Sequence, residues 1–188
     1  MKKLRIGAIS IVLGLLVCAA VVSLAVMPPA GLDTAFGAQK PEPAFRGIDA
    51  WINSAPLSLD ELHGKVVLVD FWTYSCVNCL NTLPHIKAWH EKYKDQGLVV
   101  VGVHTPEYAY EKSSRNVRDA IARLQIRYAV AQDNEYATWN AFGNHFWPAV
   151  YLIDAQGRVA YSHFGEGRYA QTEEKIRQLL GIAGAKGS

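Results

Sequence analysis

The sequence predicts an α/β fold in which helices flank a central sheet of mixed strand direction. Three observations predict it. An apolar run at Val66–Val69 is typical of a buried strand, and apolar residues three or four apart from Leu80 to Tyr93 have the spacing of a helix. A second apolar run, Leu98–Val103, completes a strand–helix–strand unit whose strands pair in parallel. Near the C-terminus, Asp154–Gly157 is a turn that joins two antiparallel strands.

The first 27 residues are a segment of their own. After the basic start Met1–Arg5, the 22 residues Ile6–Met27 carry no charge. A membrane-spanning helix needs about 20 such residues, whereas the apolar core of a cleaved signal peptide has about 7–15. The length favours a membrane anchor at residues 1–27, with a cleaved signal sequence as the alternative. Basic residues before the segment favour a cytoplasmic N-terminus and an exported body.

A linker and one domain are expected to follow. Residues 28–42 contain several prolines and glycines and no apolar periodicity, which indicates a linker. Residues 43–188 are then the α/β domain. This domain opens with two short apolar segments, Trp51–Ile52 and Leu57–Leu59, which we expect to be edge strands or a hairpin. Asp60–Gly64 is expected to be a turn.

The later elements are predicted from the same periodicities. Ser114 is expected to cap a helix with Val117 and Ile121 on its buried face. A short strand at Tyr128–Ala131 and a short helix at Glu135–Phe142 come next. Two antiparallel strands and a final helix complete the domain, and they are expected at Ala149–Ile153, at Arg158–Phe164 and around Ile176, Leu179 and Leu180.

Two cysteines lie where the first buried strand ends and its helix begins. The first turn of a helix has unpaired backbone N–H groups and the positive end of the helix dipole, which stabilise a thiolate at Cys76. Cys79 is one turn further on, close enough to attack a mixed disulfide on Cys76. The pair therefore predicts a nucleophilic thiol and a resolving thiol.

Asp70 interrupts a run that is otherwise apolar. A buried carboxylate is costly unless it is paired or protonated, so burial would raise its pKa. We interpret Asp70 as a carboxyl that exchanges a proton with Cys79. The alternative is an aspartate at a frayed strand end, facing solvent.

The loop after the second buried strand is a further candidate region. Because parallel strands end at the same edge of a sheet, His104, Thr105 and Glu107 are expected beside Cys76. Glu107 is a candidate for tuning the thiol pKa or for contacting a partner, and an ordinary loop carboxylate is the alternative.

These residues resemble the active site of the thioredoxin superfamily. The shared features are, in order, Asp70-Phe-Trp, Cys76-x-x-Cys79 and Pro84. Downstream, Trp147-Pro148 before an apolar strand resembles the superfamily's cis-proline strand, and the order of elements over residues 43–182 also fits. Within the superfamily, the chain is most similar to the TlpA/ResA-like membrane-tethered thiol-disulfide oxidoreductases and to the thioredoxin-like domain of DipZ-type proteins. The multi-span membrane domain of full DipZ-type proteins is not expected here.

The resemblance implies a thioredoxin-like fold with an N-terminal extension and a central insertion. It implies an enzyme that reduces disulfides of exported proteins through a redox-active Cys76–Cys79 disulfide, with no cofactor and no metal. Substrate contacts are implied at Trp147, Pro148 and Trp72, together with Glu107. Val77-Asn78 separates the cysteines where thioredoxin has Gly-Pro, so the redox potential and the direction of electron flow stay open.

The resemblance also implies partners and a compartment. The targets would be exported proteins such as cytochrome c precursors or copper-site assembly proteins. The electron donor would be a membrane thiol protein of the CcdA/DsbD kind. Residues 6–27 would hold the chain in the bacterial inner membrane, with the catalytic domain in the periplasm.

A thiol peroxidase is one alternative function. Thr73-Tyr-Ser-Cys76 has the Thr-x-x-Cys spacing of a peroxiredoxin. However, Val69 stands where that family has a proline, and no arginine lies nearby in the sequence to polarise a peroxide.

A copper-binding chaperone is the other alternative. It would use Cys76 and Cys79 with a distant histidine, for which His104 and His145 are candidates. A single cysteine pair is not a four-ligand zinc site.

Charge argues against a nucleic-acid partner. The net charge is +2, and without Lys2, Lys3 and Arg5 the 19 basic residues fall to 16, against 17 acidic ones. The domain is therefore close to neutral and has no basic stripe, which is the usual footprint of nucleic-acid binding.

Overall fold

The computed structural model describes residues 43–182. The predicted anchor at residues 1–27 and the linker at residues 28–42 lie outside this range. No helix within the described range is long and apolar enough to span a bilayer.

Six strands form one mixed sheet in this range, with the order β1-β4-β3-β2-β5-β6. The strands β2, β3 and β4 are parallel, whereas β1 and β5 run antiparallel to their neighbours and β6 is antiparallel to β5. Their bounds are β1 Ala50–Ile52, β2 Val66–Trp72, β3 Leu98–His104, β4 Ala129–Gln132, β5 Ala149–Ile153 and β6 Val159–Phe164. The predicted mixed sheet flanked by helices is confirmed.

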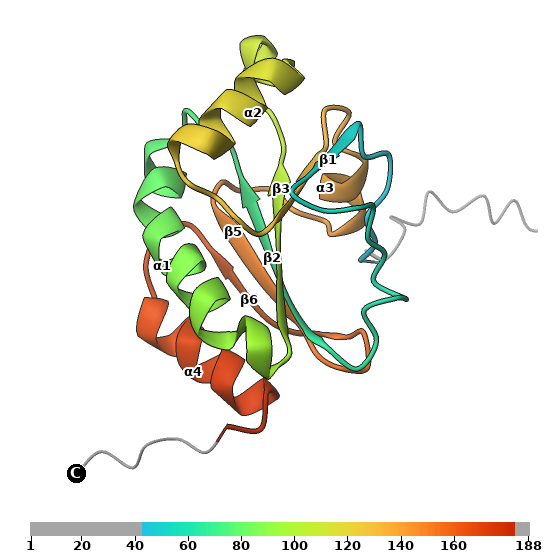
Figure 1. The fold of residues 1–188 in the computed structure, drawn as a ribbon, viewed down its shortest axis with the longest axis vertical. Helices are drawn as coiled ribbons and strands as arrows, with labels where there is room; N and C mark the ends of the chain where they lie inside the picture. The colour runs from blue at the N-terminus through green and yellow to red at the C-terminus, as the bar shows by residue number, and fades with distance from the viewer. Residues whose placement is uncertain (1–42, 183–188) are drawn as a thin grey trace, which may run out of the picture. The chain divides into compact units, whose positions relative to one another are not determined.

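Helices cover both faces of the sheet. Figure 1 shows α1 and α4 on one face and α3 on the other, near β1. The helices are α1 Val77–Tyr93, α2 Ser114–Arg123, α3 Ala137–Ala141 and α4 Tyr169–Leu179, with the short 3-10 helices η1 Lys94–Gln96 and η2 Ala109–Lys112. The segment from α2 to α3 lies between β3 and β5 in the chain, where the central insertion is expected.

Two apolar layers follow from strand alternation, because successive side chains of a strand point to opposite faces. The layer under α1, α2 and α4 includes Leu68, Leu83, Ile86, Trp89, Val100, Val117, Val150 and Ile176. The layer on the α3 side includes Val67, Val69, Phe71, Trp139, Phe142 and Tyr151. Since every residue of β2 is buried, this strand is the centre of the domain.

Of the two edge strands or the hairpin expected near the start of the domain, the edge strand at Trp51–Ile52 is confirmed as part of β1, and the hairpin is wrong. Leu57–Leu59 is not a strand, and β1 pairs with β4 instead. Asn53 explains the pairing, because its side-chain amide donates to the backbone oxygens of Ile126 (2.9 Å) and Tyr128 (3.1 Å), just before β4. This tertiary contact ties the end of β1 to a segment that is distant in the sequence.

Two predicted helix starts are also corrected. The N-cap of α2 is Ser113, whose hydroxyl accepts from the backbone N–H of Asn116, and Ser114 is already helical. Helix α3 begins at Ala137 rather than Glu135, because Tyr136 has a positive φ of 60°. Asp133 accepts from the backbone N–H groups of Thr138 (3.1 Å) and Trp139 (2.8 Å) and so fixes the start of α3.

The strand register brings three loops to one edge of the sheet. Trp72 at the end of β2 is paired with His104 at the end of β3. Phe71 is paired with Ala149, the first residue of β5. The loops that follow β2 and β3 and the loop that precedes β5 therefore meet at this edge.

Candidate active site

Cys76 and Cys79 form a disulfide at the start of α1, with their Cα atoms 5.2 Å apart. Cys76 is the N-cap of α1, and its sulfur accepts from the backbone N–H of Cys79 (3.2 Å). The first turn of α1 contains no acidic residue. Cys79 is buried and Cys76 is only partly buried. Cys76 is therefore the sulfur that a partner reaches, and Cys79 lies behind it.

Asp70 is buried in the middle of β2, which rules out the solvent-facing alternative. Burial raises the pKa of Asp70 to about 7. One carboxyl oxygen, Oδ1, has no hydrogen-bond partner among the described residues. By strand alternation, Asp70 shares the face of Leu68 and Trp72, which is the face that Cys79 also packs against. The carboxyl thus lies in the same layer as the resolving sulfur.

Gly102 lies beside this carboxyl, and neighbouring side chains occupy the space that its own side chain would need. It is paired with Asp70 across the β2–β3 ladder. A Cβ at Gly102 would lie 3.0 Å from Trp72 Nε1 and 3.1 Å from Tyr128 Cε2. The Tyr128 hydroxyl is also buried without a described partner, and its pKa is raised well above the ordinary value by burial and by the charge of Asp70. Asp70, Trp72 and Tyr128 therefore surround the position that lacks a side chain.

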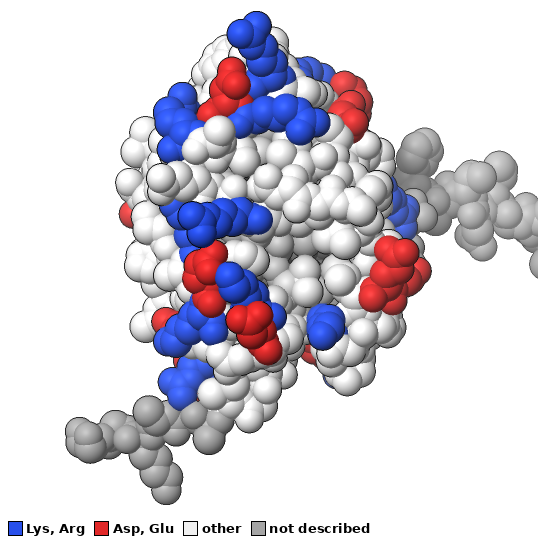
Figure 2. Space-filling view, in the orientation of Figure 1, with Lys and Arg blue, Asp and Glu red and all other residues white. Residues whose placement is uncertain are grey.

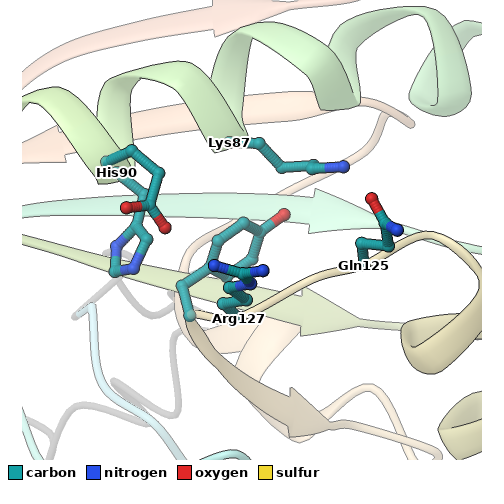
Figure 3. Close-up of a pocket in the computed structure, with 6 residues that line it drawn as sticks. Lys87, His90, Gln125 and Arg127 are labelled. Carbon is teal, nitrogen blue, oxygen red and sulfur yellow. The ribbon is translucent and has the colours of Figure 1, made fainter.

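Tyr128 also lines a surface pocket between α1 and the segment that precedes β4. The pocket has a volume of about 140 Å³, and Figure 3 shows Lys87 and His90 from α1 facing Gln125 and Arg127. Glu91 completes the lining. Tyr128 therefore lies between the surroundings of Asp70 and a pocket that opens to solvent.

Trp147 and Pro148 lie at the edge where the three loops meet. The indole Nε1 of Trp147 donates to the backbone oxygen of Thr105 (3.0 Å), and the ring packs on Trp139 with centroids 4.2 Å apart. The Trp147–Pro148 peptide bond is cis. Pro148 is buried and Trp147 is partly exposed. Trp147 thus joins the loop before β5 to the loop after β3.

The other two predicted substrate-binding residues differ in exposure: Trp72 is buried and Glu107 is exposed. Trp72 is only 2% exposed and packs edge-on against His104, so its side chain is not open to a protein substrate. Its position on the α1 face of a fully buried strand is the reason. Glu107 is exposed on the loop after β3, and its backbone N–H donates to Glu111 (2.6 Å).

Glu111 is a site residue that the sequence reasoning missed. It is fully buried, and its carboxylate accepts from the Ser75 hydroxyl at 2.5 Å, immediately before Cys76. Burial alone would raise the pKa of Glu111, but hydrogen bonds from Ser75, Thr73 and the backbone N–H groups of Tyr108 and Glu107 hold it below the ordinary value. A glutamate three residues after the N-cap of a short helix, here Tyr108 before η2, predicts the hydrogen bond from the Tyr108 backbone N–H, but no local pattern records the contact with Ser75.

His104 is buried beside the same loop. Its Nε2 is 3.2 Å from the Thr73 hydroxyl, and its ring stacks on Tyr74 with centroids 5.5 Å apart. Burial lowers the pKa of His104 to about 4, so the imidazole is neutral at neutral pH. His145, the other predicted candidate histidine, is exposed. Within residues 43–182, no group of three or more His, Cys, Asp or Glu side chains is placed to hold a metal ion.

Several large apolar side chains at this edge of the sheet are exposed. Val77 follows Cys76 and is 68% exposed. The Tyr110 hydroxyl donates to Ser75 Oγ (3.2 Å), and its ring stacks on Tyr108. The other members of this set are Phe146 and Phe164, whose rings pack 5.4 Å apart beside Trp147. On the face that Figure 2 shows, Lys and Arg are interspersed with Asp and Glu rather than gathered in one stripe.

The comparisons with known proteins agree on the family to which this chain belongs. The Redoxin family model matches residues 38–180. Protein DipZ of Mycobacterium bovis is 53% identical over 144 residues, which are 75% of this chain and 21% of DipZ. The chain therefore spans about a fifth of the length of that relative. The thiol-disulfide oxidoreductase YkuV of Bacillus subtilis is 28% identical over 142 residues, covering 76% of this chain and 95% of YkuV.

Solved structures agree on the fold. A Chlorobium tepidum protein described as thiol:disulfide interchange protein DsbE superposes with a TM-score of 0.60 at 27% identity, covering 66% of this chain and 86% of that chain. A thioredoxin-like superfamily protein, SPOA0173, superposes with a TM-score of 0.69 at 24% identity over 76% of this chain and 97% of that chain. The predicted thioredoxin-like fold is confirmed.

Proposed function

Because the chain belongs to the Redoxin family, we propose that it is a thiol-disulfide oxidoreductase whose Cys76–Cys79 dithiol reduces disulfides of exported proteins. The observation that carries this proposal is the placement of the two sulfurs. One is partly exposed at the N-cap of a helix, and the other is buried one turn further on.

The first step is attack by Cys76. Its thiolate displaces one sulfur of the target disulfide, forms a mixed disulfide, and releases the other target sulfur as a thiolate. The helix N-terminus lowers the free energy of the attacking thiolate. The hydrogen bond from the Cys79 backbone N–H to the Cys76 sulfur provides part of this stabilisation.

The second step is resolution by Cys79. Its thiol must lose a proton before it attacks the Cys76 sulfur and releases the second target thiolate. Asp70, with a pKa of about 7 and on the same face of the sheet, takes up that proton at neutral pH. The protein is left with the Cys76–Cys79 disulfide, and two electrons have passed to the target.

Target docking is proposed at the edge around the cysteines. Trp147 and Pro148 form one side of it, and apolar surface is provided by the exposed rings of Tyr110, which bonds to Ser75, and of Phe146, which precedes Trp147. Glu107, which is exposed at the same edge, is a further contact. This mixed apolar and polar edge suits an extended protein segment better than a small charged molecule.

We also propose where the reaction occurs and with which partners. Residues 6–27 anchor the chain in a bacterial inner membrane, so that the domain works in the periplasm. A dithiol membrane protein of the CcdA/DsbD kind returns two electrons to the disulfide. Cytochrome c precursors and copper-site assembly proteins are the target classes.

A trapping experiment tests the proposed function. The full chain is prepared with Cys18→Ala, so that the domain cysteines are the only thiols. We expect catalysed reduction of insulin by dithiothreitol, loss of catalysis in both single variants, and a stable mixed disulfide with Cys79→Ser but not with Cys76→Ser. Full catalysis by Cys76→Ser would rule out the assignment of the nucleophile. Rapid consumption of hydrogen peroxide by Cys79→Ser would favour the peroxidase alternative instead.

A further inference from the structure

Glu111 connects the loop that precedes Cys76 to the loop that follows β3. One carboxylate oxygen accepts from the Ser75 hydroxyl at 2.5 Å. The other accepts from the backbone N–H groups of Glu107 at 2.6 Å and Tyr108 at 2.9 Å. The side chain is fully buried, so these hydrogen bonds are shielded from water. These hydrogen bonds therefore hold the negative charge of Glu111 at one position relative to Ser75 and Cys76.

The charge of Glu111 is not neutralised by the ionisable groups nearest to it. His104, the adjacent imidazole, is neutral because burial lowers its pKa to about 4. Lys112 is bound to Glu135 at 3.0 Å on the surface. Burial is the main cause of the pKa shifts of His104, Tyr74 and Tyr136, and the charge of Glu111 adds a smaller contribution that raises each pKa, including that of Tyr74 in the loop before Cys76.

We propose that Glu111 is a positioning residue for the dithiol, which fixes the Thr73–Ser75 loop and disfavours the Cys76 thiolate through its buried negative charge. Reduction of the disulfide creates a sulfur anion at Cys76 next to this loop. Destabilising that anion destabilises the reduced form, and a less stable reduced form is a stronger reductant. Glu111 therefore opposes the helix N-terminus and biases the pair towards donating electrons. The inference rests on the proposed dithiol chemistry.

The substitution Glu111→Gln removes the charge and keeps the shape. In the variant, the amide oxygen accepts the two backbone N–H groups, and the amide nitrogen donates to Ser75 Oγ, which then acts as acceptor. The two backbone hydrogen bonds are kept, so the variant is expected to fold, whereas the amide nitrogen cannot accept from Thr73 or Ser75, which costs part of the stability. Glu107→Gln is the matched control, because it removes an equal charge four residues away from an exposed side chain.

The measurement is the pKa of the Cys76 thiol in the reduced full chain with Cys18→Ala, taken from the pH dependence of its alkylation by iodoacetamide. We expect Glu111→Gln to lower this pKa by about one unit. The midpoint potential should move in the positive direction. Glu107→Gln should change both quantities much less, because its charge is screened by water. A Cys76 pKa that is unchanged in Glu111→Gln, or equal shifts in the two variants, would overturn the proposal.

If Glu111→Gln does not fold, a second measurement that leaves Glu111 unsubstituted still tests the proposal. The carboxyl carbon of Glu111 is followed by NMR through a pH titration of the oxidised and the reduced chain. We expect an inflection at the thiol pKa of Cys76 in the reduced chain and none there in the oxidised chain. If the Glu111 signal of the reduced chain shows no inflection at the thiol pKa of Cys76, the inference is overturned. Alkylation and NMR need no disulfide substrate, so their outcome is separate from the insulin assay that tests the proposed function.

Discussion

Asp70 and Gly102 are direct partners across the β2–β3 ladder, and the missing side chain of Gly102 gives the buried carboxyl its surroundings. Trp72 and Tyr128 fill the space that a Cβ would occupy. Each of these two residues, like Asp70, has a buried polar atom without a described partner. The proton-exchanging carboxyl and the aromatic residues around it therefore form one packing unit beneath α1.

The first prediction concerns Gly102→Ala. A Cβ at 3.0 Å from Trp72 Nε1 and 3.1 Å from the Tyr128 ring requires both side chains to move. Overpacking of this kind typically costs about 1–3 kcal/mol of unfolding free energy. Urea unfolding of the oxidised chain measures the loss. In a Tyr128→Leu background the same substitution should cost less, because the ring contact is gone. An equal cost in both backgrounds would exclude the Tyr128 contact as the cause.

The second prediction concerns Asp70→Asn and pH. The folded-state pKa of about 7 lies above the ordinary value of 3.8, so the folded state binds a proton more tightly than the unfolded state. Stability is therefore lost as pH rises from about 4 to about 7. The full difference corresponds to about 4 kcal/mol. Asp70→Asn removes this loss, so the variant should be more stable than the parent at about pH 8, with a much smaller difference at about pH 4.

Urea unfolding at the two pH values checks this second prediction. Asp133→Asn is the control, because Asp133 is also buried but accepts from the backbone N–H groups of Thr138 and Trp139 with its two oxygens. An amide has only one acceptor atom, so this control should destabilise the chain at both pH values. A stability difference between Asp70→Asn and the parent that does not grow between about pH 4 and about pH 8 would contradict a raised pKa at Asp70.

The third prediction concerns Trp147→Phe. The substitution removes the hydrogen bond to the Thr105 backbone oxygen and part of the packing on Trp139. We expect reduction of insulin to slow several-fold, whereas reduction of a small aromatic disulfide changes little, because only a protein target needs the docking edge. Trp51→Phe is the control, since Trp51 packs on Phe45 at the β1 end of the sheet. Equal slowing with both disulfides would contradict a docking role.

The sequence predicts the centre of this fold better than its edges. The apolar runs of β2 and β3 and the spacing in α1 depend on local periodicity, which the sequence carries. The pairing of β1 with β4 depends on the side chain of Asn53 reaching a distant segment, which no local pattern records. At Leu57–Leu59 the strand prediction fails for a local reason, because Ser58 and Glu61 exchange hydrogen bonds that form a turn (Ser58 N–H to Glu61, 3.2 Å; Glu61 N–H to Ser58 Oγ, 3.3 Å).

The residues of the candidate active site likewise divide into those that the sequence predicts and those that depend on the three-dimensional fold. The resemblance to the thioredoxin superfamily implies the Cys76–Cys79 disulfide, and the polar interruption of an apolar strand predicts the burial of Asp70. Glu107 and Glu111 are four residues apart, and only the three-dimensional path of the loop determines which carboxylate is buried. It is Glu111 that turns inward to Ser75, while Glu107 contributes its backbone N–H. The sequence pattern therefore indicates this loop, but it does not show that Glu111 is the buried carboxylate in it.

The most direct test of the account is a redox titration of the full chain with Cys18→Ala. The protein is equilibrated in dithiothreitol and glutathione buffers, and free thiols are trapped by alkylation and counted by mass. We predict one reversible two-electron transition at Cys76 and Cys79 with a midpoint below about −220 mV, in the range of thioredoxin and glutaredoxins. A midpoint near about −120 mV would make the protein an oxidant and contradict the proposed reductase. The absence of a reversible transition would contradict the oxidoreductase assignment itself.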